Sequence, residues 1–277
     1  MFGWLSCLPA RAAATACAVA ALLTVLVSAC GTASPPRAAR SAGSPEPVLP
    51  VHLSAAQIAR LPMATTFGVS PAAPRDPNLF KPEKGLVLHP TATRVIYARP
   101  GGSPVAALPA SQLGGPTWVP VVQMQPGWDQ VLLPSRPNHS TGWIYLGGGG
   151  LQIASDGYQV EVNLARYRLT VTDGGRRLGS WKVAVGEAAT PTPAGRTFLL
   201  ASMAPVHPTF SPLILPLGLH SGSVGNFDGG PGTVGLHGWP DPAVFGHAVS
   251  HGCIRVPAAA LRVLGQVPMG SSVMITS

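Results

Sequence analysis

Charged side chains are scarce in this sequence, at 10% of 277 residues, whereas soluble proteins average about a quarter. The formal net charge is +8, but no block of five or six basic residues gathers anywhere, so a nucleic-acid partner has little support. The 33 glycines and 31 prolines disfavour long helices and favour turns and short strands. The composition therefore predicts an all-β chain with Pro-rich connections and no nucleic-acid partner.

The opening stretch also has little charge, with Arg11 alone preceding an Ala-, Val- and Leu-rich run. A positive region, an apolar region and small residues before a cleavage point are typical of a secretory signal. The run ends in Leu26-Val27-Ser28-Ala29-Cys30, which resembles a bacterial lipobox. We therefore expect residues 1–29 to be a lipoprotein signal peptide and Cys30 to be lipidated. The alternatives are an ordinary signal or an uncleaved anchor, and each places the remainder outside the cytoplasm.

Cysteine is rare, and its distribution directs attention to one thiol. Cys7 and Cys17 lie inside the predicted signal peptide, which leaves Cys30 and Cys253 in the mature chain. If Cys30 carries lipid, no disulfide can form. A free thiol in an oxidising compartment is a liability unless it is buried or used. Cys253 is therefore the residue whose role needs explaining.

Two regions precede the C-terminal half. Residues 30–84 are rich in Pro and Ala and predict a tether, with one short helical turn at about residues 55–61. Residues 85–148 alternate short apolar runs with turn signals, which predicts a small antiparallel barrel or sandwich. This second region resembles a bacterial SH3-like domain, a type that often binds peptidoglycan, in Pro100-Gly101-Gly102, Gly127-Trp128 and Thr141-Gly142-Trp143-Ile144. We expect Trp118, Trp128 and Trp143 to belong to its core.

Four glycines at residues 147–150 mark the expected domain boundary. Residues 155–277 then show the alternation of an antiparallel sheet, with Tyr158, Val160 and Val162 on one face of its first strand. Later positions predict one short helix from Pro257 to Leu264 and a final strand with Val273 and Ile275. The predicted fold is a small SH3-like β-barrel followed by a β-sandwich-like domain with one or two short helices.

The reactive side chains concentrate in the segment GLHGWPDPAVFGHAVSHGCIR, residues 235–255. A thiol attacks as its thiolate, so a nucleophilic Cys needs a base or a positive field beside it, and His serves both purposes near neutral pH. His251 shares a face with Cys253 if the segment is extended, whereas His237 reaches the thiol only if the intervening loop folds back. The residues alone leave both candidates open.

The spacing resembles a known signature, that of the L,D-transpeptidase catalytic domain of the YkuD type. It consists here of His237-Gly238 followed by Ser250-His251-Gly252-Cys253-Ile254-Arg255. The upstream Gly186 and Thr190-Pro191-Thr192-Pro193-Ala194-Gly195-Arg196 are similar to the stretch that precedes the active site in that family. The likeness covers about residues 157–277, and its motifs stand in the family's order.

This resemblance implies the roles of the site residues. Cys253 would be the nucleophile and His237 its base, with the Gly238 carbonyl orienting the imidazole. Backbone N–H groups around Gly252 and Cys253 would form the oxyanion hole, and Gly252 would allow close approach of the backbone. Three further residues would bind substrate or support the site: Ser250 by pinning the turn, His251, and Arg255 as a partner for a substrate carboxylate.

The implied reaction joins two peptidoglycan peptide stems. Cys253 would attack the carbonyl between the third residue of a tetrapeptide stem and its terminal D-Ala, and an amine of a neighbouring stem would resolve the thioester. The resemblance also implies acylation of Cys253 by carbapenem-type inhibitors, and no cofactor or metal. We expect residues 207–232 to be a lid, and His207, His220 and His247 to be ordinary core or surface residues.

Three alternatives remain open at this stage. With water as the acceptor, the same site would be an L,D-carboxypeptidase. A zinc-dependent wall hydrolase has enough ligands in His237, His247, His251 and Cys253, but no HExxH motif and no nearby Glu support it. A non-catalytic peptidoglycan-binding lipoprotein would need only the SH3-like region. In each case we expect the protein at the outer face of the cytoplasmic membrane, facing the cell wall.

Overall fold

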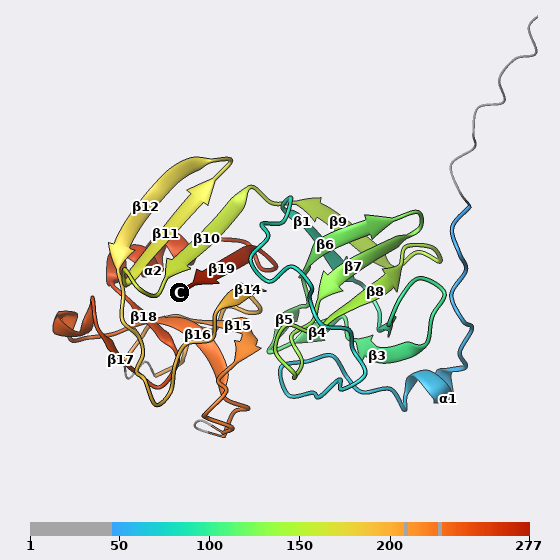
Figure 1. Cartoon of the computed structure of the whole chain (residues 1–277), viewed down its shortest axis with the longest axis horizontal. Coiled ribbons are helices and arrows are strands. Elements are labelled where there is room, and N and C mark those ends of the chain that lie inside the picture. Colours follow the sequence, from blue (N-terminus) through green and yellow to red (C-terminus); the bar gives the residue numbers. More distant parts are fainter. Residues whose placement is uncertain (1–45, 208–209, 227–228) are drawn as a thin grey trace, which may run out of the picture. The chain divides into compact units, whose positions relative to one another are not determined.

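The computed structural model describes residues 46–207, 210–226 and 229–277 (Figure 1). The predicted signal peptide, Cys30 and the beginning of the predicted tether lie outside these residues. No described helix is long and apolar enough to cross a membrane. Signal, lipidation and location outside the cytoplasm therefore stay predictions.

Strands dominate the described part of the chain, as the composition predicts. Helix is limited there to α1 (Ala55–Ile58), α2 (Ala258–Leu264) and one 3₁₀ turn, Pro242–Val244. Ser54 caps α1, because its hydroxyl accepts from the Gln57 N–H and its own N–H donates to the Gln57 side chain. The all-β prediction with one or two short helices is confirmed.

Nine strands build the N-terminal β region. Seven form one antiparallel sheet in the order β3-β2-β8-β7-β6-β1-β9, and β4 and β5 pair separately. The strands are β1 (Leu86–Pro90), β2 (Arg94–Tyr97), β3 (Pro104–Leu108), β4 (Ser111–Gln112), β5 (Gly115–Pro116), β6 (Val119–Gln125), β7 (Trp128–Leu132), β8 (Thr141–Tyr145) and β9 (Leu151–Ser155).

The closed barrel that we expected is not observed among these residues, because the sheet ends at β3 on one side and at β9 on the other. The glycines at residues 147–150 are also not the boundary. After them the chain returns as β9 and pairs with β1 from Leu86↔Ser155 to Pro90↔Leu151. The change of sheet comes only at Asp156 and Gly157, before β10 begins.

Aromatic side chains pack inside this first region. Tyr97, Trp128 and Trp143 form one buried cluster, with Tyr97 and Trp128 edge to face at 5.3 Å between ring centroids. The Trp128 indole donates to the Val48 carbonyl at 2.7 Å. The core prediction therefore holds for Trp128 and Trp143, whereas Trp118 is only half-buried.

Residues 62–84 differ from the predicted tether. Ala64, Thr66 and Asp76 are buried, and both Asp76 carboxylate oxygens accept from the Arg196 guanidinium, at 2.6 and 2.8 Å. The two side chains are 0% and 2% exposed, so each offsets the cost of burying the other. Composition suggested a tether here because it cannot show that Asp76 of this segment pairs with Arg196, which lies far along the chain.

The C-terminal region is a layered β domain. Its five-stranded sheet has the order β12-β11-β10-β19-β14, a three-stranded sheet has the order β15-β16-β18, and β13 pairs with β17. The strands are β10 (Tyr158–Asn163), β11 (Arg168–Asp173), β12 (Arg176–Lys182), β13 (Val185–Gly186), β14 (Gly195–Phe198), β15 (Ile214–His220), β16 (Thr233–Gly238), β17 (Ala248–Ser250), β18 (Ile254–Val256) and β19 (Ser272–Thr276).

Both larger sheets contribute to one aliphatic core. The predicted alternation is observed, since Val160, Val162, Val273 and Ile275 are buried in it together with Leu236 from the smaller sheet. Helix α2 covers the same core with buried Leu261 and Leu264 among other residues. The predicted helix and final strand are therefore confirmed, and the core fixes the strands that carry the reactive segment.

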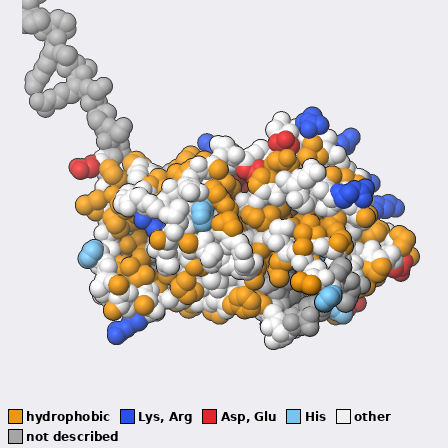
Figure 2. Space-filling view, turned by 180° about the vertical axis from the view of Figure 1, so that it is seen from behind, with side chains coloured by type: hydrophobic (Ala, Val, Ile, Leu, Met, Phe, Trp, Pro, Cys, Tyr) orange, Lys and Arg blue, Asp and Glu red, His pale blue; other side chains and the backbone are white. Residues whose placement is uncertain are grey.

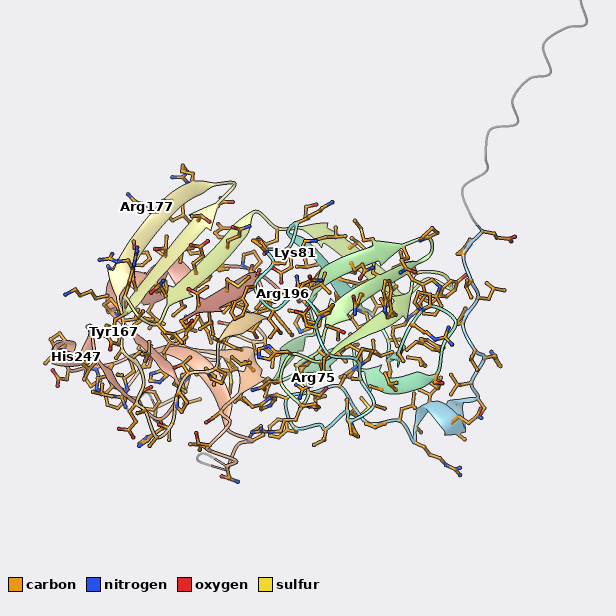
Figure 3. The ribbon with its side chains drawn as sticks, in the orientation of Figure 1. Arg75, Lys81, Tyr167, Arg177, Arg196 and His247 are labelled. Carbon is orange, nitrogen blue, oxygen red and sulfur yellow. The ribbon has the colours of Figure 1, made fainter. Side chains whose placement is uncertain are left out.

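Basic residues that are separated along the sequence come together on the hairpin β11–β12. Arg168, Arg176, Arg177 and Lys182 are exposed, and Arg168 lies directly opposite Lys182 in the strand register. Figure 2 shows Lys and Arg side chains gathered at one end of the molecule. In Figure 3, Arg177 projects from the sheet, whereas Arg196 lies inside the structure.

Candidate active site

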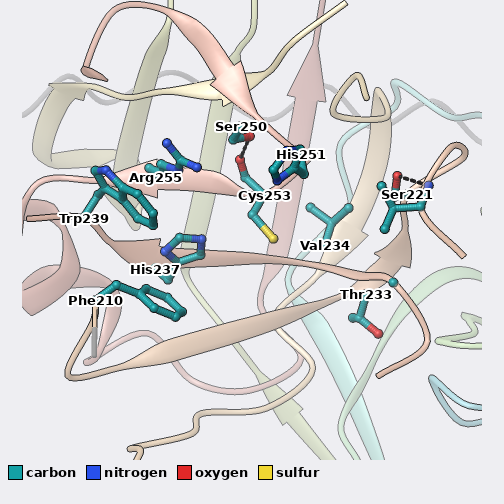
Figure 4. A pocket seen from close by; sticks show the side chains of 12 residues that line it. Phe210, Ser221, Thr233, Val234, His237, Trp239, Ser250, His251, Cys253 and Arg255 are labelled. Atoms are coloured by element: carbon teal, nitrogen blue, oxygen red, sulfur yellow. Dashed lines mark hydrogen bonds between the residues drawn. The ribbon is translucent and has the colours of Figure 1, made fainter. Parts of the chain in front are cut away.

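Two adjacent parallel strands position the reactive residues. Leu236 of β16 lies opposite Ile254 of β18, and His237 lies opposite Arg255. Leu236 and Ile254 are fully buried in the core. Because side chains alternate along a strand, His237 and Arg255 face away from that core, and Cys253 shares their side. The chain thus folds back as His237 requires, and Figure 4 shows the Cys253 sulfur and the His237 imidazole in one pocket.

The His237 ring is held by its own strand. Its Nδ1 lies 2.8 Å from the Gly238 carbonyl oxygen, the contact expected from the sequence. A carbonyl only accepts, so Nδ1 carries the proton and Nε2 remains free to accept one. Burial lowers the pKa of His237; the Gly238 bond raises it and the Arg255 charge lowers it further. The lowered pKa favours the neutral form of His237, in which Nε2 can accept a proton.

Cys253 is the free thiol of the described chain. Burial raises its pKa, while a backbone hydrogen bond from Gly235 and the Arg255 charge lower it less. Burial disfavours the charged form of both members of the pair. The two pKa shifts therefore both favour the neutral forms, a thiol at Cys253 and an uncharged imidazole at His237.

The turn before Cys253 is fixed by Ser250. The Ser250 hydroxyl donates to the Cys253 carbonyl at 2.5 Å and accepts from the Gly252 N–H at 3.2 Å. Gly252 has a φ of +115°, and a Cβ there would meet nothing closer than 3.7 Å. The positive φ alone is reason enough for glycine here, and the expected close approach to a substrate stays a prediction.

The stretch around Thr190 and Thr192 supports this turn from behind. The Thr192 hydroxyl donates to the Gly252 carbonyl at 2.8 Å and accepts from the Gly186 N–H at 2.9 Å. The Thr190 hydroxyl donates to the Ser250 carbonyl at 3.0 Å. The upstream residues picked out in the sequence thus orient the backbone that carries the thiol.

A pocket of about 330 Å³ surrounds the pair. Its walls are mostly apolar, with the two histidines, the thiol and one guanidinium as their chemically active groups. The lining residues are Phe210, Ser221, Val224, Gly232, Thr233, Val234, His237, Trp239, Ser250, His251, Cys253 and Arg255.

Two aromatic residues of this wall were not anticipated. Phe210 meets His237 edge to face at 5.0 Å between ring centroids, and the Arg255 guanidinium lies 3.7 Å above the Trp239 ring centre. Trp239 stands two residues after His237, and residues two apart in a strand lie on the same face. The sequence could therefore have placed Trp239 beside His237. Phe210 lies in the segment 207–232 that we expected to cover the site, but nothing in the sequence singled out this residue within it.

Residues 157–275 match the family model of the L,D-transpeptidase catalytic domain, YkuD. The chain carries an L,D-transpeptidase catalytic domain. The match spans β10 to β19 and includes the whole reactive segment. A comparison with curated protein sequences gave no significant match.

Solved structures similar to this chain are themselves L,D-transpeptidases. One from Mycobacterium smegmatis is 14% identical, with 57% of this chain and 99% of that one covered and a TM-score of 0.38. L,D-transpeptidase 3 from Mycobacterium tuberculosis, in complex with a faropenem-derived adduct, is 15% identical, with 50% and 74% covered and a TM-score of 0.36. The catalytic domain from E. faecium is 22% identical, with 43% and 95% covered and a TM-score of 0.34.

The expected oxyanion hole of the transpeptidase domain is only partly available. The Gly252 N–H is already used by the Ser250 hydroxyl. The Cys253 N–H makes no hydrogen bond to any residue that the structure describes. Of the two expected donors, the Cys253 N–H is therefore the one free to meet a developing oxyanion.

The remaining histidines divide by burial. His251 is exposed and lines the pocket, whereas His207 and His247 are exposed and outside its wall. His220 is fully buried and its Nε2 lies 2.7 Å from the Thr66 carbonyl oxygen. These positions fit the core or surface roles expected for His207, His220 and His247.

The lid expected over residues 207–232 needs correction. Strand β15 occupies Ile214–His220 and its side chains are mostly buried, so regular sheet structure runs through the middle of that range. Of the residues on either side of β15, Phe210 before it and Ser221, Val224 and Gly232 after it line the pocket.

Metal ligation has no candidate in the part of the chain described, where no three His, Cys, Asp or Glu side chains are grouped to hold an ion. Arg255 lies over Trp239 and faces the pocket, as a carboxylate-binding residue would.

Proposed function

We propose that this protein is an L,D-transpeptidase that cross-links peptidoglycan between third-position stem residues through a Cys253 thioester. The observation that carries the proposal is the pairing of β16 with β18. It brings a half-buried thiol and an imidazole with a free Nε2 into one pocket. The family match supports the same reaction class.

The first step is acylation. His237 Nε2 takes the thiol proton as Cys253 Sγ attacks the carbonyl carbon of the third residue in a tetrapeptide stem. A C–S bond forms and the carbonyl electrons move onto oxygen, where the Cys253 N–H stabilises the charge. The C–N bond to D-Ala then breaks, and His237 returns the proton to the leaving amine. The product is a thioester and free D-Ala.

The second step is transfer to an amine. A neutral side-chain amine of a second stem attacks the thioester carbonyl and gives its proton to His237. The C–S bond breaks, and Cys253 regains the proton from His237 as the amide cross-link forms. Transfer competes with water, and the aromatic rings of Phe210 and Trp239 favour the amine by limiting water near the pair.

The charged groups of the pocket suit a peptide stem with free carboxylates. Arg255 presents a guanidinium, and Trp239 orients it from below. His251 stands exposed at the wall, where it contacts an incoming stem. Opposite charge and the planar fork of Arg255 together favour a carboxylate ligand over a neutral one.

The location and further partners belong to the same proposal. Lipidation at Cys30 would hold the enzyme at the outer face of the cytoplasmic membrane, facing the wall. Peptidoglycan stems would be donor and acceptor, and carbapenem-type inhibitors would acylate Cys253. We include inhibitor acylation in the proposal because the M. tuberculosis L,D-transpeptidase 3 was solved in complex with a faropenem-derived adduct.

The test is mass spectrometry of the products formed from tetrapeptide-stem muropeptides, with Cys253→Ala as the control. We expect cross-linked dimers that have lost one D-Ala, and none with the variant. Free tripeptide stems alone would make the protein an L,D-carboxypeptidase. Unchanged substrate would leave the non-catalytic wall-binding lipoprotein as the better account. Intact mass after incubation with a carbapenem tests the thioester site separately.

A further inference from the structure

Ser221, Val224 and Gly232, from the loop between β15 and β16, form part of the pocket wall, yet this loop is held by a residue outside the catalytic domain. Its described residues, 221–226 and 229–232, are called loop 221–232 below. Arg136 precedes β8 in the N-terminal region. Its Nη2 donates to the Pro231 carbonyl at 2.9 Å, and Nη1 and Nη2 both lie 3.5 Å from the Ser221 carbonyl oxygen. One guanidinium thus contacts both ends of the loop. A charged planar donor suits this task, because it serves two carbonyls at once.

The loop closes on itself above this guanidinium. The Ser221 N–H donates to the Gly232 carbonyl at 2.9 Å, and the Val224 N–H donates to the Ser221 hydroxyl at 3.0 Å. Gly232 has a φ of +69°, and a Cβ there would lie 2.0 Å from the Val224 carbonyl oxygen and 3.4 Å from Arg136 Nη2. The closure therefore needs a glycine, and Arg136 lies against it.

Neighbouring contacts hold the adjacent strand ends. The Asn138 side chain donates to the His220 carbonyl at 2.6 Å and accepts from the His220 N–H at 2.9 Å. The Thr66 and Thr233 hydroxyls are 2.6 Å apart. Residues 66, 136 and 138 all precede the catalytic domain, which begins near residue 157. The N-terminal region therefore fixes the strand ends on both sides of the loop.

We propose that Arg136 is a positioning residue, which holds loop 221–232 in the shape that receives the donor stem. The proposal rests on the proposed function and deepens it. Arg136 does not line the pocket, whereas Ser221, Val224 and Gly232 do. Loss of the guanidinium should therefore weaken binding of the peptide stem and leave the chemistry of Cys253 unchanged.

The first test does not depend on turnover. Hydrogen exchange of the Ser221 and Val224 amides is measured in the full chain, solubilised in detergent, for Arg136→Met and for Arg99→Met. Arg99 is an exposed arginine of the same region and serves as the matched control. We expect exchange to accelerate about tenfold or more in Arg136→Met, the size of one lost charge-assisted hydrogen bond, and to stay unchanged in Arg99→Met. Unchanged exchange in Arg136→Met overturns the proposal.

The second test separates binding from chemistry. With tetrapeptide muropeptides, Arg136→Met should raise KM about tenfold and change kcat less than about twofold. Alkylation of Cys253 by iodoacetamide should be unaffected. Arg136→Lys, which keeps the charge but loses the fork, should show an intermediate KM and provides a milder variant if Arg136→Met does not fold.

A fall in kcat and alkylation at constant KM would refute the positioning role. If the wild-type chain shows no turnover, the proposed function is refuted instead. The exchange result would still decide whether Arg136 holds loop 221–232.

Discussion

The two β regions place their aromatic side chains differently. In the N-terminal region, Tyr97, Trp128 and Trp143 are buried together and supply core volume. In the catalytic domain, the buried residues of the main core are aliphatic, Phe198 of β14 packs into the core of the N-terminal region, and Phe210 and Trp239 stand in the pocket wall. The comparison teaches that aromatic rings fill the centre of the first region, whereas the rings beside His237 and Cys253 form a pocket wall.

The difference has a thermodynamic basis. A buried tryptophan contributes several kcal/mol to folding, and its removal leaves a large cavity. A ring at a pocket wall stays partly exposed and contributes less, but its apolar face remains available to a substrate. If this comparison is correct, substitutions in the two regions should separate stability from activity.

The largest expected effect is on catalysis, from His237→Gln. The substitution removes the base that the aromatic wall surrounds, and we expect acylation of Cys253 by muropeptide to slow about 10²- to 10⁴-fold. Single-turnover kinetics measures this. The control is His251→Gln, at the exposed wall, with a loss of less than about tenfold. A larger loss from His251→Gln than from His237→Gln would reassign the base to His251.

Trp128→Ala should have the largest effect on stability. The indole is fully buried, so we expect the free energy of unfolding to fall by about 3–5 kcal/mol. Urea denaturation measures the loss, and alkylation of Cys253 in the folded protein should be unchanged. Half-buried Trp118→Ala is the matched control, with a smaller loss. Similar losses from the two would contradict the role of Trp128 as a core residue.

Much of the catalytic domain was predictable, because its determinants are local. Alternating apolar residues gave β10 and β11, and the proline and glycine around residues 257–265 gave α2. The segment that carries His237 and Cys253 could be recognised from its spacing alone. The choice of His237 over His251 needed the family resemblance, since residues sixteen positions apart meet only through the pairing of β16 with β18.

The remainder depends on contacts between distant positions. Asp76 and Arg196 pair across the fold, so a Pro-rich segment that reads as a tether is instead anchored. After residues 147–150 the chain turns back, and β9 pairs with β1. This adds an edge strand to the sheet for which we had expected a closed barrel. The oxyanion-hole prediction had the same weakness. The Gly252 N–H donates to the Ser250 hydroxyl, and the sequence does not show which partner a backbone amide binds.

A smaller effect, on binding, is expected from Trp239→Ala. Losing the ring removes its contact with the Arg255 guanidinium and apolar wall area, so kcat/KM for muropeptide should fall about tenfold. The free energy of unfolding should fall by no more than about 1 kcal/mol, because the ring is only half-buried. Steady-state kinetics and urea denaturation of the same preparation test both parts. A loss of stability as large as that from Trp128→Ala would break the comparison.

The smallest effect is a shift in pH dependence. Burial lowers the pKa of His237 from its ordinary value of 6.5. Neutral His237 is the proposed base, so acylation should rise with pH through a midpoint below 6.5. Phe210 contributes to that burial, since its ring meets the imidazole at 5.0 Å. Phe210→Ala admits water, stabilises the imidazolium and should move the midpoint up toward 6.5. The pH profile of single-turnover acylation measures it. An unmoved midpoint would mean that the aromatic wall shapes the substrate site without tuning the base.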